Sequence, residues 1–92
     1  MGANRPFGDV PSASERAVRV YRLLKREGRM PRDRIMQVCG FPAPDDQPVI
    51  SYALFAGTID RLNRTLPGRT GERIIGGIET GEVYFITQGA RG

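Results

Sequence analysis

The sequence contains no histidine, one cysteine and one lysine among its 92 residues. Without histidine, the chain lacks the commonest general base and the commonest metal ligand in proteins. One cysteine cannot form a structural zinc site or an internal disulfide, and a lone thiol fits a reducing cytoplasm. We therefore expect a cytoplasmic protein that is not an enzyme and that holds neither a metal nor a cofactor.

Long apolar stretches are also missing. No run approaches the roughly 18 apolar residues that a membrane-spanning helix requires, and residues 1–10 lack the apolar segment of a signal peptide. We therefore expect no contact with a membrane and no export.

The chain is basic, with a formal net charge of +4 and an isoelectric point near 10. Such a charge on a small domain favours a polyanionic partner, most often nucleic acid. Residues 13–40 hold eight basic and three acidic residues, whereas residues 41–92 hold five basic and six acidic ones. The positive charge is therefore concentrated in the first half of the chain.

Spacing of apolar residues predicts three helices, at about 13–27, 31–39 and 48–66. Ser12 and Glu15 have the spacing of a capping box, and Gly28 suits the end of the first helix. Asp45 or Asp46 is expected to cap the third helix. Two β-rich runs at 73–77 and 83–87, with glycines between them, predict a hairpin. We expect residues 1–12 to be a flexible arm and 89–92 a tail, with one domain over 13–88.

The hydrophobic pattern also predicts which side chains are buried. The candidate core residues come from all three helices and from both strands of the hairpin. They are Val20, Tyr21, Leu24, Ile35, Cys39, Phe55, Ile59, Leu62, Ile75 and Phe85.

The last third of the chain resembles a known family. Ile-Asp-Arg-Leu-Asn-Arg-Thr-Leu at 59–66, Arg-Ile-Ile at 73–75, a tip with glycines and Val-Tyr-Phe at 83–85 resemble the end of bacterial response-regulator effector domains, which are winged helix-turn-helix domains. The resemblance implies an α+β winged helix with three helices and a C-terminal β-hairpin wing. It also implies binding to double-stranded DNA, with the third helix in the major groove and the wing on the flanking DNA.

Two sets of residues are candidates for DNA contacts. The resemblance points to residues on the third helix and the hairpin, namely Thr58, Arg61, Arg64, Arg69 and Arg73. The charge distribution points instead to phosphate contacts from the first two helices, namely Arg16, Arg19, Arg26 and Arg32. A stripe of arginines can equally be the solvated face of an amphipathic helix, so both interpretations stay open.

An alternative function rests on the same fold. Ile50 and Leu54 are expected on the exposed face of the third helix, and the hairpin tip carries Glu79 and Glu82. An apolar helix face beside an acidic wing is typical of a protein-interaction surface, such as that of an adaptor or a small inhibitor. The same two apolar residues make a homodimer a further expectation. The main hypothesis is a small DNA-binding regulatory protein.

Overall fold

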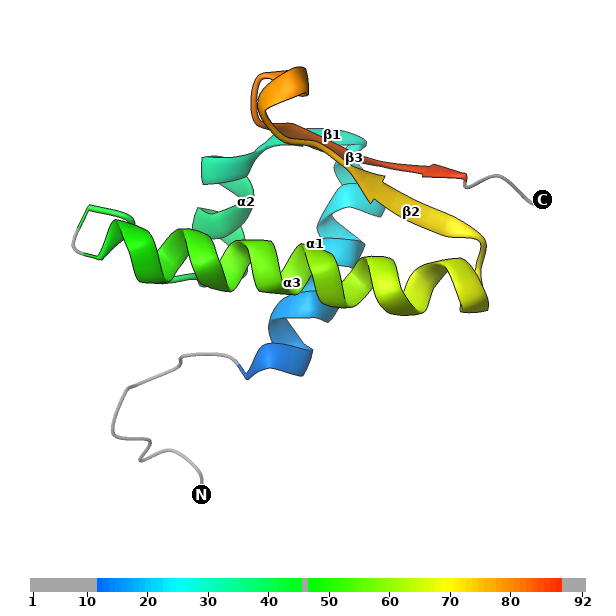
Figure 1. Ribbon diagram of the computed structural model, residues 1–92, viewed down its shortest axis with the longest axis horizontal. Helices are drawn as coiled ribbons and strands as arrows, with labels where there is room; N and C mark the ends of the chain where they lie inside the picture. Colours follow the sequence, from blue (N-terminus) through cyan, green and yellow to red (C-terminus); the bar gives the residue numbers. More distant parts are fainter. Residues whose placement is uncertain (1–11, 46, 89–92) are drawn as a thin grey trace.

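The computed structural model describes residues 12–45 and 47–88, and within them the chain is an α+β domain. The domain consists of three helices and three strands, and the strands form one antiparallel sheet (Figure 1). Their order is α1 (Ala13–Glu27), β1 (Arg29–Pro31), α2 (Arg32–Cys39), α3 (Pro48–Arg69), β2 (Glu72–Ile75), the 3-10 turn η1 (Ile78–Thr80) and β3 (Val83–Gln88). The α+β class and the three helices are confirmed. Residues 1–11, in the expected arm, and 89–92, the expected tail, lie outside the described part.

Helix α1 has both of the ends that its sequence predicts. The Glu15 amide donates to Ser12 Oγ at 3.2 Å, and the Ser12 amide donates to Glu15 Oε1 at 2.9 Å, which completes the capping box. Gly28 ends the helix with φ of 91°, and its amide donates to the Leu24 carbonyl. A positive φ is accessible to glycine without steric cost, so α1 stops at this residue.

Helix α3 differs from the prediction at both ends. It begins after Gln47, whose side chain makes no capping bond, so Asp45 is not the cap; Asp46 lies outside the described residues. It continues past the predicted end at Leu66 and contains Pro67. Proline has no amide hydrogen, so Pro67 removes one helical hydrogen bond, the one that its nitrogen would donate to the Asn63 carbonyl. The amide and hydroxyl of Thr70 both donate to the Leu66 carbonyl and close the helix.

The sheet has the order β1-β3-β2, and strand β1 was not predicted. It pairs Arg29 with Phe85 and Met30 with Tyr84. Three residues are too few to show a strand pattern in sequence. As a result, β3 has a partner on each side, and β1 and β2 form the edges.

The two predicted core residues of the hairpin face the wrong way. Glu72 and Ile74 point inward from β2, while Ile75 is 37% exposed on the outer face of the sheet. Phe85, which pairs with Ile75, is half-buried on that outer face beneath the Arg29 guanidinium, 4.8 Å from its ring centroid. Ile74 is buried instead, and Tyr84 and Ile86 pack against the core. The prediction of Ile75 and Phe85 as core residues is therefore wrong by one position in each strand.

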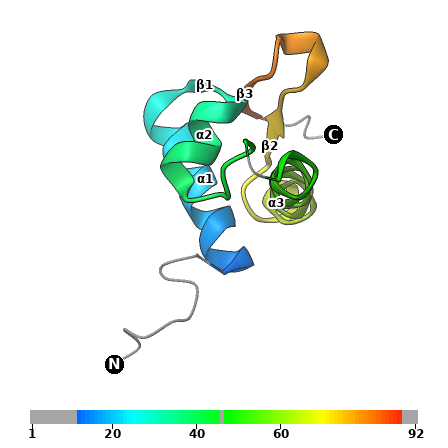
Figure 2. The ribbon, with the colours of Figure 1, turned by 90° about the vertical axis from the view of Figure 1, so that its left-hand side faces the viewer.

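The core lies where the three helices meet the inner face of the sheet (Figure 2). Six of the predicted core residues are buried, namely Val20, Leu24, Ile35, Cys39, Phe55 and Leu62, and Tyr21 and Ile59 are half-buried at its margin. Burial raises the pKa of the Cys39 thiol to about 11, which agrees with its interpretation as a small buried hydrophobe.

Asn63 of α3 protects the open edge of β2. Its side-chain amide donates to the Ile74 carbonyl at 3.0 Å, and the Ile74 amide donates to its Oδ1 at 2.7 Å. Both backbone groups of Ile74 that face away from β3 are thus satisfied. This pair of bonds covers part of an edge that would otherwise be free to pair with another strand.

Candidate nucleic-acid interface

The outer face of α3 is the longest helical surface that the other elements leave uncovered. The helix crosses the front of the molecule in Figure 1, with Ser51, Phe55, Thr58, Leu62 and Leu66 buried on its inner side. Arg61 and Arg64 lie on the exposed side. Guanidinium groups on an uncovered helix are suited to phosphates or to the edges of bases.

A groove of about 260 Å³ between the start of α1 and the middle of α3 brings three arginines together. We call it the Arg16 groove, and its arginines are Arg16, Arg61 and Arg64. Arg16 comes from the first predicted set and the other two come from the second. One arginine of the first set and two of the second therefore meet at one surface.

The partners of Arg61 and Arg64 among the described residues are exposed and weak. Arg64 pairs with Asp60 one turn away at 3.1 Å, and both side chains are about two-thirds exposed or more. Exposed ion pairs of this kind contribute about 0.5 kcal/mol, so a phosphate can replace the carboxylate at little cost. Arg61 donates one hydrogen bond, from Nη2 to Ser14 Oγ at 3.0 Å. A guanidinium has five donors, so most of them remain for another ligand.

Thr58 does not fit the role predicted for it. It lies at the floor of the Arg16 groove, is 5% exposed, and donates its hydroxyl to the Leu54 carbonyl at 2.8 Å. Because the hydroxyl proton is used inside the helix, Thr58 is a packing residue rather than a DNA contact.

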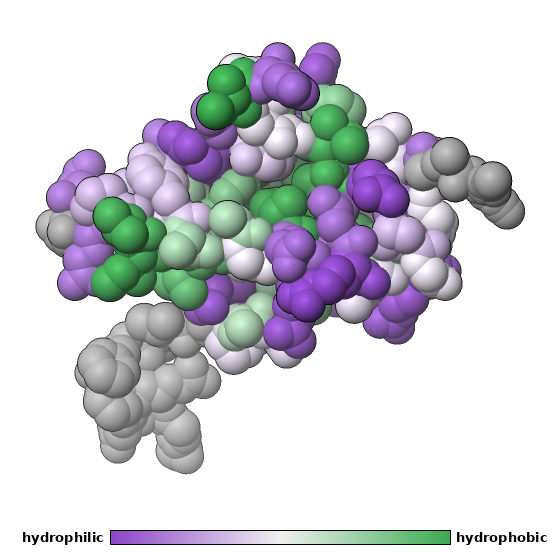
Figure 3. Space-filling model, in the orientation of Figure 1, coloured by the Kyte–Doolittle hydropathy of each residue, from purple (hydrophilic) through white to green (hydrophobic). Residues whose placement is uncertain are grey.

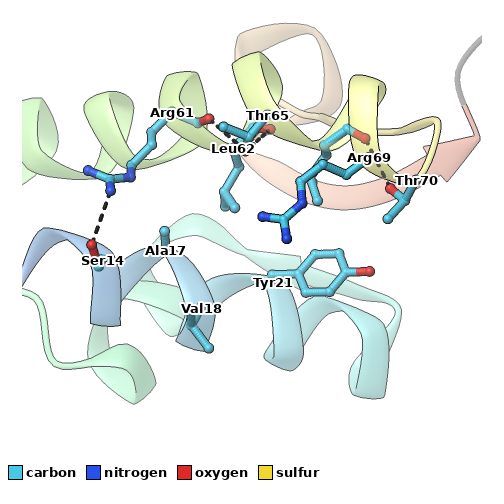
Figure 4. Close-up of a pocket in the computed structure, with 10 residues that line it drawn as sticks. Ser14, Ala17, Val18, Tyr21, Arg61, Leu62, Thr65, Arg69 and Thr70 are labelled. Atoms are coloured by element: carbon cyan, nitrogen blue, oxygen red, sulfur yellow. Dashed lines mark hydrogen bonds between the residues drawn. The ribbon is translucent and has the colours of Figure 1, made fainter.

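A second groove, of about 450 Å³, lies between α1 and the last two turns of α3 (Figure 4). We call it the Tyr21 groove. Arg61 stands at one end, where it bonds to Ser14, and Arg69 leans from α3 toward the Tyr21 ring. Arg69 therefore shares the Tyr21 groove with Arg61, and it does not line the Arg16 groove.

The other predicted arginines are not brought to either groove. Arg73 alternates with buried residues along β2 and lies on the outer face of the sheet, opposite the face that covers α3. Arg19 and Arg26 lie close enough to Cys39, at the end of α2, to lower the pKa of its thiol against the larger effect of burial. They therefore belong to the side of α1 that faces α2.

Arg32 has partners on three elements. Its Nε lies 3.1 Å from Asp33, its Nη1 lies 3.2 Å from Glu82, and its guanidinium stands 4.2 Å from the centroid of the Tyr52 ring. Its amide also donates to the Glu82 carbonyl at 2.8 Å. The side chain is 26% exposed. Arg32 therefore fastens the hairpin to α2 and α3, and a phosphate would have to compete with these partners for its guanidinium.

Apolar side chains are exposed at two places on the surface, at the start of α3 and at the tip of the hairpin. Figure 3 shows hydrophobic surface at the start of α3 and at the tip of the hairpin. Val49 is 80% exposed, Ile50 is 52% exposed and Ile78 of η1 is 88% exposed. Leu54, the other predicted contact, is half-buried and packs against the core, so Val49 rather than Leu54 accompanies Ile50 at the surface.

Glu72 is a buried charged residue that the sequence analysis missed. It is 3% exposed, accepts the Tyr21 hydroxyl at 2.6 Å and pairs with Lys25 Nζ at 2.7 Å. The hydrogen bonds from Lys25 and then Tyr21 lower the pKa of Glu72 to about 2. This cluster joins α1 to β2 and holds the Tyr21 ring beside its groove. The available signal was strand alternation: an inward Ile74 requires an inward Glu72, and a buried carboxylate requires a partner.

Comparison with protein-family models, with curated proteins and with solved structures finds no match to this chain. In the described part, none of the helices is long and apolar enough to cross a membrane. The same residues contain no cluster of three or more histidine, cysteine, aspartate or glutamate side chains that could hold a metal ion.

Proposed function

We propose that this chain is a winged helix that binds double-stranded DNA and serves as a small regulatory protein. The order α1, β1, α2, α3, β2, β3, with a hairpin after the longest helix, supports this fold. In this arrangement α3 would enter the major groove, and the hairpin β2–β3 would lie on the flanking DNA.

The observation that carries the proposal is the Arg16 groove. It brings together one arginine of α1 and two of α3, and none of the described residues that line it is acidic. The Arg16 guanidinium itself lies over the Phe41 ring, 5.7 Å from its centroid. Its walls include Ala53, whose side chain is a single methyl group, and Gly57, which has no side chain, so a DNA backbone has room to approach. If DNA phosphates bind in the Arg16 groove of the protein, Arg61 and Arg64 would lie beside the major groove of the duplex.

The acidic residues that oppose DNA binding are partly neutralised. Glu82, at the hairpin tip, pairs with Arg32. Glu79 remains exposed at the hairpin tip without an ion pair among the described residues. A single uncompensated carboxylate at the tip repels phosphate less than the two counted from sequence.

The test is fluorescence anisotropy with a pool of mixed duplex sequences over a salt series. The wild type is expected to lose affinity steeply as salt rises, because each phosphate contact releases counterions. Arg61→Gln with Arg64→Gln should reduce the slope of log affinity against log salt by about 2. The matched control is Arg19→Gln with Arg26→Gln, which removes the same charge from the side of α1 that faces α2.

Two results would contradict this assignment. If the wild type does not bind DNA at low salt, the proposed function fails. If only the Arg19 and Arg26 pair abolishes binding, the chain binds DNA through a different face.

A protein-interaction module is the second candidate function. The exposed Val49, Ile50 and Ile78 favour it, because apolar residues gathered at a surface are typical of protein contacts. The contact could be with another protein or with a second copy of the chain. Ile50→Ser with Val49→Ser should then abolish the complex, or the dimer in light scattering, and leave DNA affinity unchanged.

A further inference from the structure

The Tyr21 groove has the shape of a ligand site and the charge of an anion site. Its volume of about 450 Å³ lies within the range of small-molecule pockets, roughly 300–1,000 Å³. Its floor is apolar, formed by Ala17 of α1 and by Leu62 and Leu66 of α3. An occupant therefore needs an apolar body.

Among the described residues that line the Tyr21 groove, the two charged ones are both arginines and none is a carboxylate. Tyr21, which lines the groove, has the acidic partner Glu72. The Glu72 carboxylate already accepts hydrogen bonds from Lys25 and from the Tyr21 hydroxyl. Because that hydroxyl donates to Glu72, Tyr21 offers its ring rather than its hydroxyl proton to the groove. Arg69 makes no ion pair with any described residue. Within the described part of the chain, the groove therefore has two cations and no anion that compensates them.

The two arginines are spaced along one helix. Arg69 follows Arg61 by eight positions, which separates their backbones by about 12 Å along α3 at about 1.5 Å per residue. Both side chains lean toward α1, so they stand at opposite ends of the apolar floor (Figure 4). This spacing fits an elongated molecule with an acid group at each end.

We propose that the Tyr21 groove binds a small organic dianion, in which two carboxylates are joined by an apolar chain. Arg61 and Arg69 bind the two carboxylates, and the chain lies on Ala17, Leu62 and Leu66 beside the Tyr21 ring. Arg61 also lines the Arg16 groove, so the dianion competes with DNA for this guanidinium. That competition, but not the binding itself, rests on the proposed function.

The experiment is an amide NMR titration of the full chain with three probes of equal length: sebacate, decanoate and the neutral 1,10-decanediol. Sebacate is expected to shift the amides of residues that line the groove, Val18 and Thr65 among them. Its affinity should exceed that of decanoate by about tenfold, since one charge-assisted hydrogen-bond pair is lost. The diol should bind more weakly than either acid.

Variants distinguish recognition of the charged groups from nonspecific hydrophobic binding. Arg69→Gln should weaken sebacate binding by about tenfold, to the level of decanoate on the wild type. Thr65→Glu should abolish it, because Thr65 lines the groove and the new carboxylate repels the probe. Arg22→Gln is the matched control, since Arg22 is exposed on α1 and does not line the groove. It should leave the affinity unchanged.

Four results would overturn the proposal. The first three are the absence of shifts in the groove, equal binding of the diol and the diacid, and equal effects of Arg69→Gln and Arg22→Gln. The fourth is a set of groove shifts that depend on protein concentration without any probe, because these would show that a second copy of the chain binds in the groove. A final measurement adds sebacate to the DNA complex. If sebacate binds in the groove and leaves the complex intact, the shared role of Arg61 is wrong while the anion site stands.

Discussion

Replacing Glu72 with glutamine is expected to make the protein less stable and less sensitive to acid. Hydrogen bonds from Lys25 and Tyr21 lower the Glu72 pKa from an ordinary 4.5 to about 2. At about 1.4 kcal/mol for each pH unit, this difference corresponds to about 3 kcal/mol of folding free energy. Lys25 is half-exposed, so solvent screens its part, and we expect Glu72→Gln to cost about 2 kcal/mol near neutral pH.

The sign of the pH dependence follows from the lowered pKa. The ionised Glu72 stabilises the folded protein fully above pH 4.5, where the unfolded chain is ionised as well, and this contribution is lost as the pH falls toward 2. The hydrogen bond to Glu72, followed by burial, raises the pKa of Tyr21 above its ordinary value of 10. The contribution of Tyr21 is therefore present below pH 10 and is lost as the pH rises through its folded pKa.

The assay is urea unfolding at several pH values between 2.5 and 7. The wild type should lose about 2 kcal/mol more than Glu72→Gln over this range. Glu79→Gln is the matched control, because Glu79 is exposed at the hairpin tip and should leave the profile unchanged. Parallel profiles for the wild type and Glu72→Gln would refute the conclusion that α1 is joined to β2 through an ionised carboxylate.

Three further predictions concern stability and contact. In Gly76→Ala, the new Cβ would lie 2.2 Å from the Tyr84 ring, so a loss of about 2 kcal/mol is expected in urea unfolding; Gly68→Ala, where nothing lies within 4 Å, should show none. Gly57→Ala also meets nothing within the chain and should stabilise α3 by about 1 kcal/mol. If DNA approaches that position, the same variant should bind DNA more weakly, whereas unchanged affinity would place the contact elsewhere. Asn63→Leu removes both hydrogen bonds to the edge of β2, so hydrogen exchange of the Ile74 amide should accelerate. Unchanged protection of this amide would mean that Asn63 does not protect the edge.

Much of the candidate site depends on contacts between distant parts of the chain. Arg61 and Arg64 were expected on the third helix, and they lie on the exposed side of α3. The sequence could not tell that Arg16 shares a groove with them, or that Arg32 is held by the hairpin and Tyr52. Each of these outcomes requires α1 or α2 to be placed against a segment that follows much later in the chain. A stripe of arginines has the same pattern whether its partner is water, a carboxylate or a ring.

The sequence by itself determined α1 and the place of the hairpin in the chain, because their signals are local, although β2 (Glu72–Ile75) ends two residues before the predicted strand at 73–77 does. A capping box, helical spacing and a glycine at the end need no tertiary partner. Only the tertiary structure decided the orientation of the strands. Ile74 and Ile75 are adjacent, and residues 83–86 are all apolar or aromatic, so no alternation distinguishes the inner face from the outer one. Packing of Tyr84 against Phe55, with ring centroids 5.0 Å apart, and pairing with the three residues of β1 fixed that choice.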